Sequence, residues 1–335
     1  MKLLVIGSNS FSGSHFVNQA LQEDHEVIGI SRSKQPRSLF LPYKWHLDDK
    51  DRKILKRNFT FKSIDINQNL DLLIDIVDEH MPEYIINFAS QGMVAESWLE
   101  PIHWYKTNLL SQVAFHDQLR KRKFLKKYVH ISTPEVYGET NGWIEENHLF
   151  NPTTPYSVSR AACDSHLLSF FKAYEFPVVF TRAANVYGPG QQLYRIIPRT
   201  ILSIKTGKPL QLHGGGYSKR SFIHISDVVK ATLKLTFDGE PGSCWHLSTR
   251  EALSIRDLVK KICEISNFPF DKIVNEVDER LGKDKNYFLN SDKIRNVHNW
   301  QDSIKLEDGI RQTIDWVDKN IEELNKLPWD YIHKK

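Results

Sequence analysis

Cysteine is scarce in this chain of 335 residues, which holds only Cys163, Cys244 and Cys263. Three thiols so far apart in the sequence supply neither a disulfide framework nor a cysteine-based metal site. Their scarcity suits a reducing compartment. The 14 histidines include no pair at ligand spacing, so we expect no metal site.

Long apolar runs and targeting signals are also missing. No segment reaches the roughly 20 apolar residues that span a bilayer. A predicted strand that begins at residue 2 leaves no room for a signal peptide. We therefore expect a cytoplasmic protein without membrane contact, and the sequence shows no internal repeat or low-complexity segment.

Charge of one sign is limited as well. The formal net charge of +4 is small for 335 residues and does not suggest a nucleic-acid partner. The basic run Arg120–Lys123 is typical of a solvated helix end. Apolar residues make up 40% and charged residues 26% of the chain, which is ordinary for a globular protein, and the length allows two lobes.

What the sequence does contain is an alternation of short apolar runs with helix-length spacers. This alternation is typical of strands joined by helical crossovers in a parallel sheet. Leu70, Leu73, Ile74 and Val77 keep the period of a helix. We therefore predict an α/β protein with a Rossmann-type doubly wound parallel sheet. The predicted strands are Lys2–Ile6, His25–Ile30, one within Phe59–Ile66 that ends at Asp65, Tyr84–Phe88, Tyr128–Ile131 and Pro177–Phe180.

A tight turn follows the first predicted strand. Gly7 and Gly13 hold the outer positions of a G-x-x-G-x-x-G pattern with Ser10 in the middle, and an amphipathic helix follows from Ser14. Such a turn directs helix amides at a pyrophosphate. Glycine turns after a first strand are common, so the pattern favours a dinucleotide site only in combination with the alternating strands.

A phenol and a cation lie one helical turn apart at Tyr156 and Arg160. The cation favours the phenolate, the form in which tyrosine acts as a base. Arginine can bind two ribose hydroxyls but cannot lose a proton. The alternative interpretation is a surface Tyr–Arg pair on a helix.

Hydroxyl and carboxylate groups follow the strand that ends at Ile131. Ser132 and Thr133 could donate hydrogen bonds to a substrate hydroxyl, and Glu135 could remove a proton next to a carbonyl. The carboxyl edge of a parallel sheet is where open α/β folds bind ligands. The alternative is that Glu135 is a capping or surface residue.

These segments resemble the extended short-chain dehydrogenases/reductases, specifically the nucleotide-sugar 4,6-dehydratase branch that acts on dTDP-glucose or GDP-mannose. Ser132–Gly138 is similar to the signature Ser-Thr-Asp-Glu-Val-Tyr-Gly, and Tyr156–Arg160 to the motif Tyr-x-x-x-Lys. The resemblance covers nearly the whole chain. Further similar segments are Phe88–Gln91, Thr107–Asn108, Asn185–Pro189, Gly207–Gly214 and Arg220–Val228.

The resemblance implies the residues of the site. The implied catalytic residues are Thr133, Glu135, Tyr156 and Arg160. The implied cofactor ligands are Gly7, Ser10, Phe11, Ser12, Gly13, Ser31, Arg32, Asp65, Ile66, Phe88, Ala89, Ser90, Asn108, Tyr156 and Arg160. The implied substrate ligands are Gln91, Thr133, Pro134, Glu135, Asn185, Arg195, Gln211, His213, Arg220 and Arg280, with Asp284 nearby in the sequence.

The resemblance also implies a reaction. The cofactor takes hydride from C4 of an NDP-hexose while Tyr156 takes the hydroxyl proton with help from Thr133. Glu135 then removes the C5 proton, water leaves from C6, and hydride returns to C6 to give an NDP-4-keto-6-deoxyhexose. We expect the cofactor to stay bound throughout.

Three positions depart from the family pattern. Pro134 replaces the aspartate that protonates the leaving C6 hydroxyl in the dTDP-glucose enzymes, whereas GDP-mannose enzymes carry serine there. Arg160 replaces lysine, and Ser10 replaces glycine. These departures indicate a divergent branch. Glu135, once protonated from C5, could itself protonate the leaving oxygen.

The end of the second predicted strand bears on the choice between NADP and NAD. Ser31 stands where an NAD-preferring site usually has an acid for the ribose 2′-hydroxyl. Arg32 and Ser33 could hold a 2′-phosphate. We therefore favour NADP over NAD, against the alternative that Arg32 is a solvated loop residue.

The lobes and the assembly follow from the same resemblance. We assign residues 1–180 to the dinucleotide-binding domain, with residues 221–247 returning to it, and 181–335 mainly to a nucleotide-sugar-binding lobe. A helix with a serine cap should begin at Ser254, a late amphipathic helix should include Ile310 and Val317, and the tail 329–335 should be poorly packed. A homodimer is implied through the helices near Lys106–Arg120 and Tyr156; Leu167, Leu168, Phe170 and Phe171 are compatible with it or with a core.

Three rival functions stay open. A nucleotide-sugar 4-epimerase would share the hydride step without needing a base at C5. A nucleotide-sugar reductase, or a dehydratase with another elimination site, would differ in product. A non-catalytic binding protein on a decayed Rossmann fold would lose turnover, although joint retention of Thr133, Glu135, Tyr156 and Arg220 argues against it.

Overall fold

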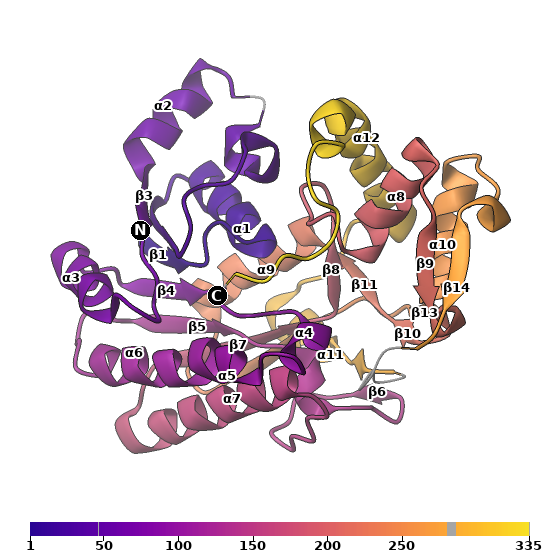
Figure 1. The fold of residues 1–335 in the computed structure, drawn as a ribbon. Helices are drawn as coiled ribbons and strands as arrows, with labels where there is room; N and C mark the ends of the chain where they lie inside the picture. The colour runs from indigo at the N-terminus through magenta and orange to yellow at the C-terminus, as the bar shows by residue number, and fades with distance from the viewer. Residues whose placement is uncertain (46, 280–285, 335) are drawn as a thin grey trace.

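A seven-stranded sheet is the centre of the first lobe in the computed structural model, which describes residues 1–45, 47–279 and 286–334 (Figure 1). The strand order is β12-β7-β5-β4-β1-β2-β3, and every neighbouring pair is parallel. The predicted Rossmann-type fold is therefore confirmed. The strands are β1 (Lys2–Ile6), β2 (Glu26–Ser31), β3 (Phe59–Ser63), β4 (Tyr84–Asn87), β5 (Lys127–Ile131), β7 (Val178–Ala183) and β12 (Cys244–Leu247).

Helices cover both faces of this sheet. Leu4 and Ile6 of β1 point to one face, whereas Leu3 and Val5 point to the other, and all four are buried. On the first face lie α3 (Leu70–His80), α6 (Ser111–Leu119) and α7 (Pro155–Tyr174); on the second lie α1 (Phe11–Gln22) and α9 (Ile225–Asp238). The carboxyl ends of the seven parallel strands all lie at one edge of the sheet.

Short elements connect these layers. They are α2 (Asp49–Asn58), α4 (Val94–Ser97), α5 (Pro101–Tyr105), β6 (Trp143–Ile144) and the single turns η1 (Ser38–Phe40), η2 (Pro42–Lys44), η3 (Lys106–Leu110) and η4 (Pro134–Tyr137). Among the described residues, none of the helices combines the length and apolar character that crossing a bilayer requires.

The second lobe is built from helices and two-stranded ladders. Its largest apolar cluster joins α8 (Ile196–Thr206), α10 (Ile255–Ile265) and α12 (Leu306–Leu324). The predicted serine cap is confirmed, because Ser254 Oγ accepts from Asp257 N at 3.0 Å. The remaining elements are β8 (Asn185–Tyr187), β9 (Leu210–His213), η5 (Gly214–Gly216), β10 (Lys219–Arg220), β11 (Phe222–His224), β13 (Leu253–Ser254), η6 (Phe270–Lys272), β14 (Val274–Val277), β15 (Phe288–Leu289) and α11 (Asp292–His298).

Two details of the strands differ from the prediction. β3 ends at Ser63 rather than Asp65, because the chain turns at Asp65, whose Oδ1 accepts from Asn67 N at 2.9 Å. β11, which follows Ser221, pairs with β8 and not with the main sheet, whereas β12 joins the sheet beside β7.

The C-terminal tail is held at Trp329 and His333, whereas Asp330, Ile332 and Lys334 are exposed, so the predicted poor packing is confirmed only in part. Trp329 is only 8% exposed and its Nε1 donates to Leu324 O at 3.2 Å. Further along, the His333 ring stacks on Trp104 with centroids 5.1 Å apart. Aromatic residues hold the segment although its charged neighbours suggested a solvated end.

A buried carboxylate ties α7 to the sheet. Asp164 is inaccessible to solvent, and its Oδ2 accepts from Arg182 Nη2 at 2.8 Å and from Ser132 Oγ at 2.7 Å. Burial alone would raise the pKa of Asp164, but nearby His130 and the Arg182 charge hold that pKa far below its usual value. Asp164 therefore stays ionised and pairs with an equally buried Arg182.

We expect Asp164→Asn to lower the free energy of unfolding by about 3–5 kcal/mol, because the variant leaves the Arg182 guanidinium buried without a counter-charge. Urea unfolding followed by circular dichroism measures this. The matched control is Asp117→Asn, which removes the exposed ion pair with Arg120 and should change little. Equal effects of the two substitutions would contradict the importance given to the buried pair.

Candidate active site

The turn after β1 is pressed against the end of β4. Gly7 has φ of +80°, and a Cβ there would lie 2.7 Å from Ala89 N. A Cβ on Gly13 would lie 2.2 Å from Gly7 O. Both glycines are therefore required by close backbone approach.

Ser10 takes the place of the middle glycine without blocking the helix end. It is the N-cap of α1, and its Oγ accepts from Gly13 N at 3.1 Å. The amides of Phe11 and Ser12 belong to the first turn, where no intrahelical acceptor exists. These donors and the helix dipole fit the pyrophosphate of a dinucleotide.

The residues at the end of β2 include the cation Arg32 and no acidic side chain. Ser31 is 8% exposed, and its Oγ accepts from Asn9 N at 2.9 Å, so the hydroxyl faces the phosphate turn. Arg32 follows, with Nη1 donating to Lys334 O at 3.1 Å. Asp65 and the buried Ile66 lie beyond the neighbouring β3.

Beyond β4, one buried amide fixes the loop that begins with Phe88, Ala89 and Ser90. Asn108 lies in the π-turn η3, an irregularity that often marks functional sites. Its Oδ1 accepts from Gln91 N at 2.8 Å, and its Nδ2 donates to Gln91 O at 3.1 Å and Ser159 Oγ at 3.0 Å. These contacts make Asn108 a positioning residue that joins this loop to α7.

Tyr156 lies in the first turn of α7 and is 9% exposed. Burial and the Glu135 carboxylate raise the pKa of its phenol; Arg160, a hydrogen bond with Thr133, and Arg195 oppose that rise. Arg160 therefore lowers the pKa of Tyr156, as the sequence analysis expected, but burial and Glu135 together raise that pKa by more. Thr133 is thus hydrogen-bonded to this phenol, and the charges of Glu135 and Arg195 act on its pKa in opposite directions.

Arg160 is turned under Tyr156 toward the sheet. It is 2% exposed; its Nη2 donates to Ile131 O and lies 3.3 Å from His130 Nε2. Nε is buried without a partner among the described residues. Part of the guanidinium is thus engaged by the sheet, and the contact of Arg160 with two ribose hydroxyls stays a prediction.

The turn η4 carries Pro134 and Glu135 at the carboxyl end of β5. Thr133 is its N-cap, with Oγ1 accepting from Glu135 N at 3.3 Å, and Pro134 occupies the first position, which suits its fixed φ. The Ser132 hydroxyl is engaged by Asp164, so Thr133 is the hydroxyl left for a substrate.

Tyr287 is a second phenol in the site that the sequence analysis missed. It is 8% exposed, its Oη donates to Asn185 Oδ1 at 2.9 Å, and Arg220 lies over its ring at 4.2 Å. Burial raises the pKa of Tyr287; the charge of Arg220 lowers it, whereas Glu135 and Tyr156 raise it further. No motif in the sequence singles out this residue, since its position depends on the second lobe folding back over η4.

The remaining predicted substrate ligands are spread along the second lobe. Asn185 and Arg220 both contact Tyr287, and the charge of Arg195 lowers the pKa of Tyr156. Farther away, Gln211 is exposed on β9, and His213 Nδ1 lies 3.0 Å from Asp278 O. The predicted Arg280 and Asp284 lie outside the described residues.

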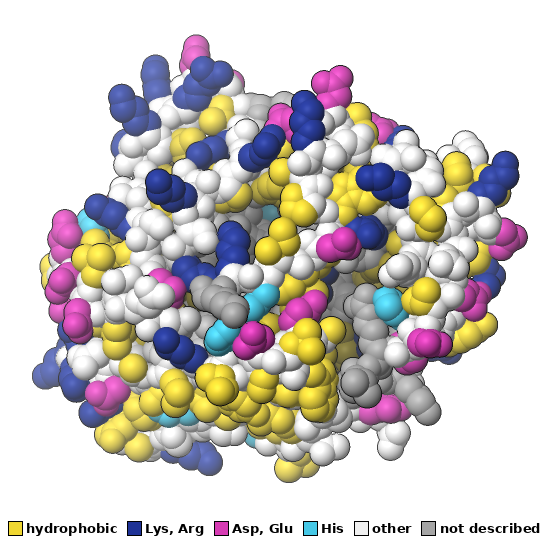
Figure 2. All heavy atoms as spheres, in the orientation of Figure 1, with side chains coloured by type: hydrophobic (Ala, Val, Ile, Leu, Met, Phe, Trp, Pro, Cys, Tyr) yellow, Lys and Arg dark blue, Asp and Glu magenta, His cyan; other side chains and the backbone are white. Residues whose placement is uncertain are grey.

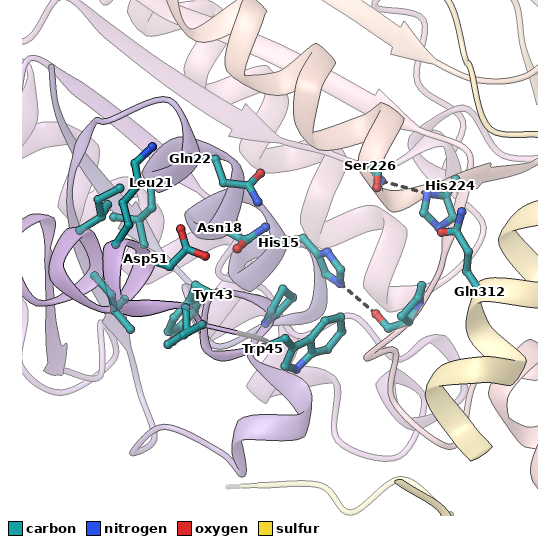
Figure 3. A pocket seen from close by; sticks show the side chains of 16 residues that line it. His15, Asn18, Leu21, Gln22, Tyr43, Trp45, Asp51, His224, Ser226 and Gln312 are labelled. Carbon is teal, nitrogen blue, oxygen red and sulfur yellow. Dashed lines mark hydrogen bonds between the residues drawn. The ribbon is translucent and has the colours of Figure 1, made fainter. Parts of the chain in front are cut away.

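A separate hollow of about 450 Å³ lies behind α1 (Figure 3). Its lining includes His15, Tyr43, Trp45 and His224, and none of the predicted site residues. Burial lowers the pKa of His15 and of His224 to about 4, so both imidazoles are neutral near pH 7. The chemistry of the chain therefore converges at the sheet edge and not in this hollow.

Comparisons with known proteins agree with this arrangement. The family model described as GDP-mannose 4,6 dehydratase matches residues 4–313. A trifunctional UDP-glucose 4,6-dehydratase/UDP-4-keto-6-deoxy-D-glucose 3,5-epimerase/UDP-4-keto-L-rhamnose-reductase from Arabidopsis thaliana is 29% identical over 96% of this chain. The chain spans 47% of the length of that relative.

Solved structures with the same fold include two kinds of enzyme. The dTDP-glucose 4,6-dehydratase of Bacillus anthracis in complex with NAD has a TM-score of 0.82 and 27% identity, covering 96% of this chain and 98% of that one. The UDP-glucose 4-epimerase of Thermotoga maritima with UDP-glucose has a TM-score of 0.83 and 25% identity, covering 96% of this chain and 100% of that one.

The family match spans more than nine-tenths of the chain, and the glycine turn, the Thr-Pro-Glu turn and the Tyr156 helix all lie within it. The chain therefore belongs to the GDP-mannose 4,6-dehydratase family of nucleotide-sugar dehydratases, within the extended short-chain dehydrogenases/reductases.

Proposed function

We propose that this protein is an NDP-hexose 4,6-dehydratase that forms an NDP-4-keto-6-deoxyhexose. One observation carries the proposal: Glu135 lies in η4 at the carboxyl end of β5, two residues after Thr133, whose hydroxyl is hydrogen-bonded to the buried Tyr156 phenol. A carboxylate so close to a proton-accepting phenol can serve a second proton transfer on the same sugar ring.

The donors of the phosphate turn fit a nicotinamide dinucleotide. When bound, such a cofactor would supply a hydride acceptor for C4 and a hydride donor for C6. The amides of Phe11 and Ser12 would hold its pyrophosphate, and Asn108 would keep the Gln91 loop in place beside it.

Oxidation at C4 needs a base for the hydroxyl proton. Tyr156 would accept that proton, and the Thr133 hydroxyl, hydrogen-bonded to Tyr156, would hold the C4 oxygen. The raised pKa of Tyr156 makes the phenolate a minor form near neutral pH, so Arg160 and Arg195 favour the reactive form by opposing that rise.

Elimination follows because the C4 ketone makes the C5 hydrogen acidic. Glu135 would remove the C5 proton, the C5–C6 double bond would form, and the C6–O bond would break. Since Pro134 has no acidic proton, Glu135 carrying the C5 proton would protonate the leaving oxygen and release water. Hydride would then return to C6, and C5 would take up a proton, which is balanced by the C4 hydroxyl proton that Tyr156 holds and gives up.

The rival function is a nucleotide-sugar 4-epimerase. It is favoured by the missing acid at Pro134 and by the similarity to the Thermotoga maritima epimerase. It would return hydride to C4 and would leave Glu135 without a role in proton transfer. A reductase acting on a keto sugar would instead consume the cofactor and need free NADH or NADPH.

We expect incubation with a panel of UDP-, dTDP-, GDP- and CDP-hexoses to yield a 4-keto-6-deoxy sugar from one of them, detected by its absorbance in alkali and by mass. Glu135→Gln should slow product formation by about 10²–10⁴-fold, as for loss of a general base. Because Glu135 raises the pKa of Tyr156, the pH midpoint of the remaining C4 oxidation should move to lower pH.

The matched control is Glu139→Gln, which changes an exposed carboxylate four residues farther along the chain and should leave the rate unchanged. Interconversion of C4 epimers without loss of water would establish the epimerase instead. Elimination that survives Glu135→Gln would refute the assigned base.

We also propose that NADP is the preferred cofactor. Ser31 is turned inward, so the end of β2 presents the Arg32 guanidinium where NAD enzymes carry an acid. Denaturing the purified protein and identifying the released dinucleotide by mass should give NADP. Arg32→Ala should then weaken binding of NADP more than of NAD, and release of NAD alone would overturn this assignment.

A homodimer is the proposed assembly. Leu99, Ile102 and Leu110 are 79%, 76% and 63% exposed on and beside α5 and η3, where Figure 2 shows hydrophobic side chains gathered. Light scattering should give twice the 39.1 kDa of the chain, and Ile102→Glu should give one chain. Val297→Glu, at an exposed apolar residue on α11, is the control, and a monomeric unchanged protein would refute the dimer.

A further inference from the structure

The last residues of the chain leave the second lobe and cross to the first. After α12 the segment Trp329–Lys334, here named the strap, passes in front of the sheet edge toward α4 and α5 (Figure 1). Its contacts, taken in order, trace the crossing, and none of the motifs discussed above includes it.

The strap starts on the second lobe. The Trp329 ring packs in the cluster of α8, α10 and α12, with Lys208 Nζ 4.4 Å from its centre and Arg199 over it at 5.4 Å. Arg199 also forms an ion pair with Asp330 at 3.1 Å. These contacts anchor the start of the strap to the second lobe.

The middle of the strap lies against the residues just before α8. The Tyr331 ring meets Tyr194 edge to face with centroids 5.4 Å apart. Tyr194 directly precedes Arg195, whose charge reaches the Tyr156 phenol. Tyr331 therefore lies within a few residues of the proposed reacting groups.

The end of the strap is held by the first lobe. The His333 ring stacks on Trp104, which is fully buried, and its Nε2 lies 2.9 Å from His103 Nδ1. The next carbonyl, Lys334 O, accepts from Arg32 Nη1 at 3.1 Å. Arg32 follows β2, whose carboxyl end lies beside the adenosine ribose in a Rossmann fold.

The strap is therefore attached beside α8 on one lobe, and at α5 and the end of β2 on the other. We propose that the strap is the outer wall of the dinucleotide site, which closes over the bound cofactor and slows its release. This proposal uses the dinucleotide groove of the proposed function but requires no particular sugar reaction.

A wall of this kind suits the chemistry. A cofactor that returns its hydride in every cycle does not need to dissociate between cycles, so slow release does not lower the turnover rate. Between Trp329 and His333 the strap makes few contacts, chiefly those of the Tyr331 ring, and Ile332 is 63% exposed. A segment with so few buried groups can open without unfolding either lobe.

The test is a variant that ends at Asp330 and so keeps the Trp329 anchor while removing the crossing. Protein stripped of nucleotide is loaded with isotope-labelled NADP⁺, or in a second arm NAD⁺, and chased with unlabelled dinucleotide without any sugar. We expect release from the truncated protein to be faster by about tenfold or more, since affinity differences appear mostly in the dissociation rate. The melting temperature of the nucleotide-free protein should be unchanged.

Arg37→Ala is the matched control, because Arg37 joins the first lobe to α12 through Glu323 at 3.2 Å outside the strap. It should release dinucleotide at the rate of the unchanged protein. His333→Ala is a second variant in case the truncation lowers the melting temperature, and it should also speed release. In the unchanged protein, hydrogen exchange of residues 325–334 should slow when dinucleotide binds.

Three outcomes would overturn the proposal. The first is equal release rates for the truncated and unchanged proteins. The second is tighter binding after truncation, which would mean that the strap occupies the groove in place of the cofactor. The third is hydrogen exchange of the strap that ignores dinucleotide. A failed dehydratase assay with strap-dependent release would refute the sugar reaction alone.

Discussion

The ion pair between Asp164 and Arg182 is the interaction on which the site depends. It joins α7 to β7 where both side chains are fully buried, and the same carboxylate accepts a hydrogen bond from the Ser132 hydroxyl at the end of β5. Tyr156 lies about two turns before Asp164 on the same helix. A shift of α7 along the sheet would therefore move the phenol away from Thr133 and Glu135, and a buried pair with fixed partners resists such a shift.

Each departure from the family pattern is accommodated by local geometry. The Ser10 side chain turns back onto its own helix, so the turn keeps the close contact that Gly7 and Gly13 make. The guanidinium of Arg160 is longer than an ammonium group and finds its acceptor, Ile131 O, beneath the site. Pro134 begins a turn that suits proline, which preserves the position of Glu135 while removing an acid. The three residues thus fit the local backbone of this chain, and Pro134 contributes no acidic proton.

The sequence predicted the sheet well because buried parallel strands are short, apolar and regularly spaced. It also predicted that Thr133, Glu135 and Tyr156 lie at one edge of the sheet, because the carboxyl ends of parallel strands and the starts of the helices that follow them share that edge. It could not predict Tyr287, whose place depends on a contact between lobes far apart in the sequence. Nor could it predict that Arg160 would turn inward, that Trp329 would lie under Lys208, or that His333 would stack on Trp104. Rotamers and long-range packing leave no periodic signal in the sequence.

The arginine at position 160 restricts how protons can move within the proposed site. Its guanidinium cannot hand a proton onward, so the buried phenol of Tyr156 has no relay through that neighbour. In the proposed reaction the sugar releases one proton from the C4 hydroxyl and one from C5, while the departing hydroxide takes one and C5 regains one. Two protons are released and two are taken up, so the proposed reaction requires no net exchange of protons with bulk water.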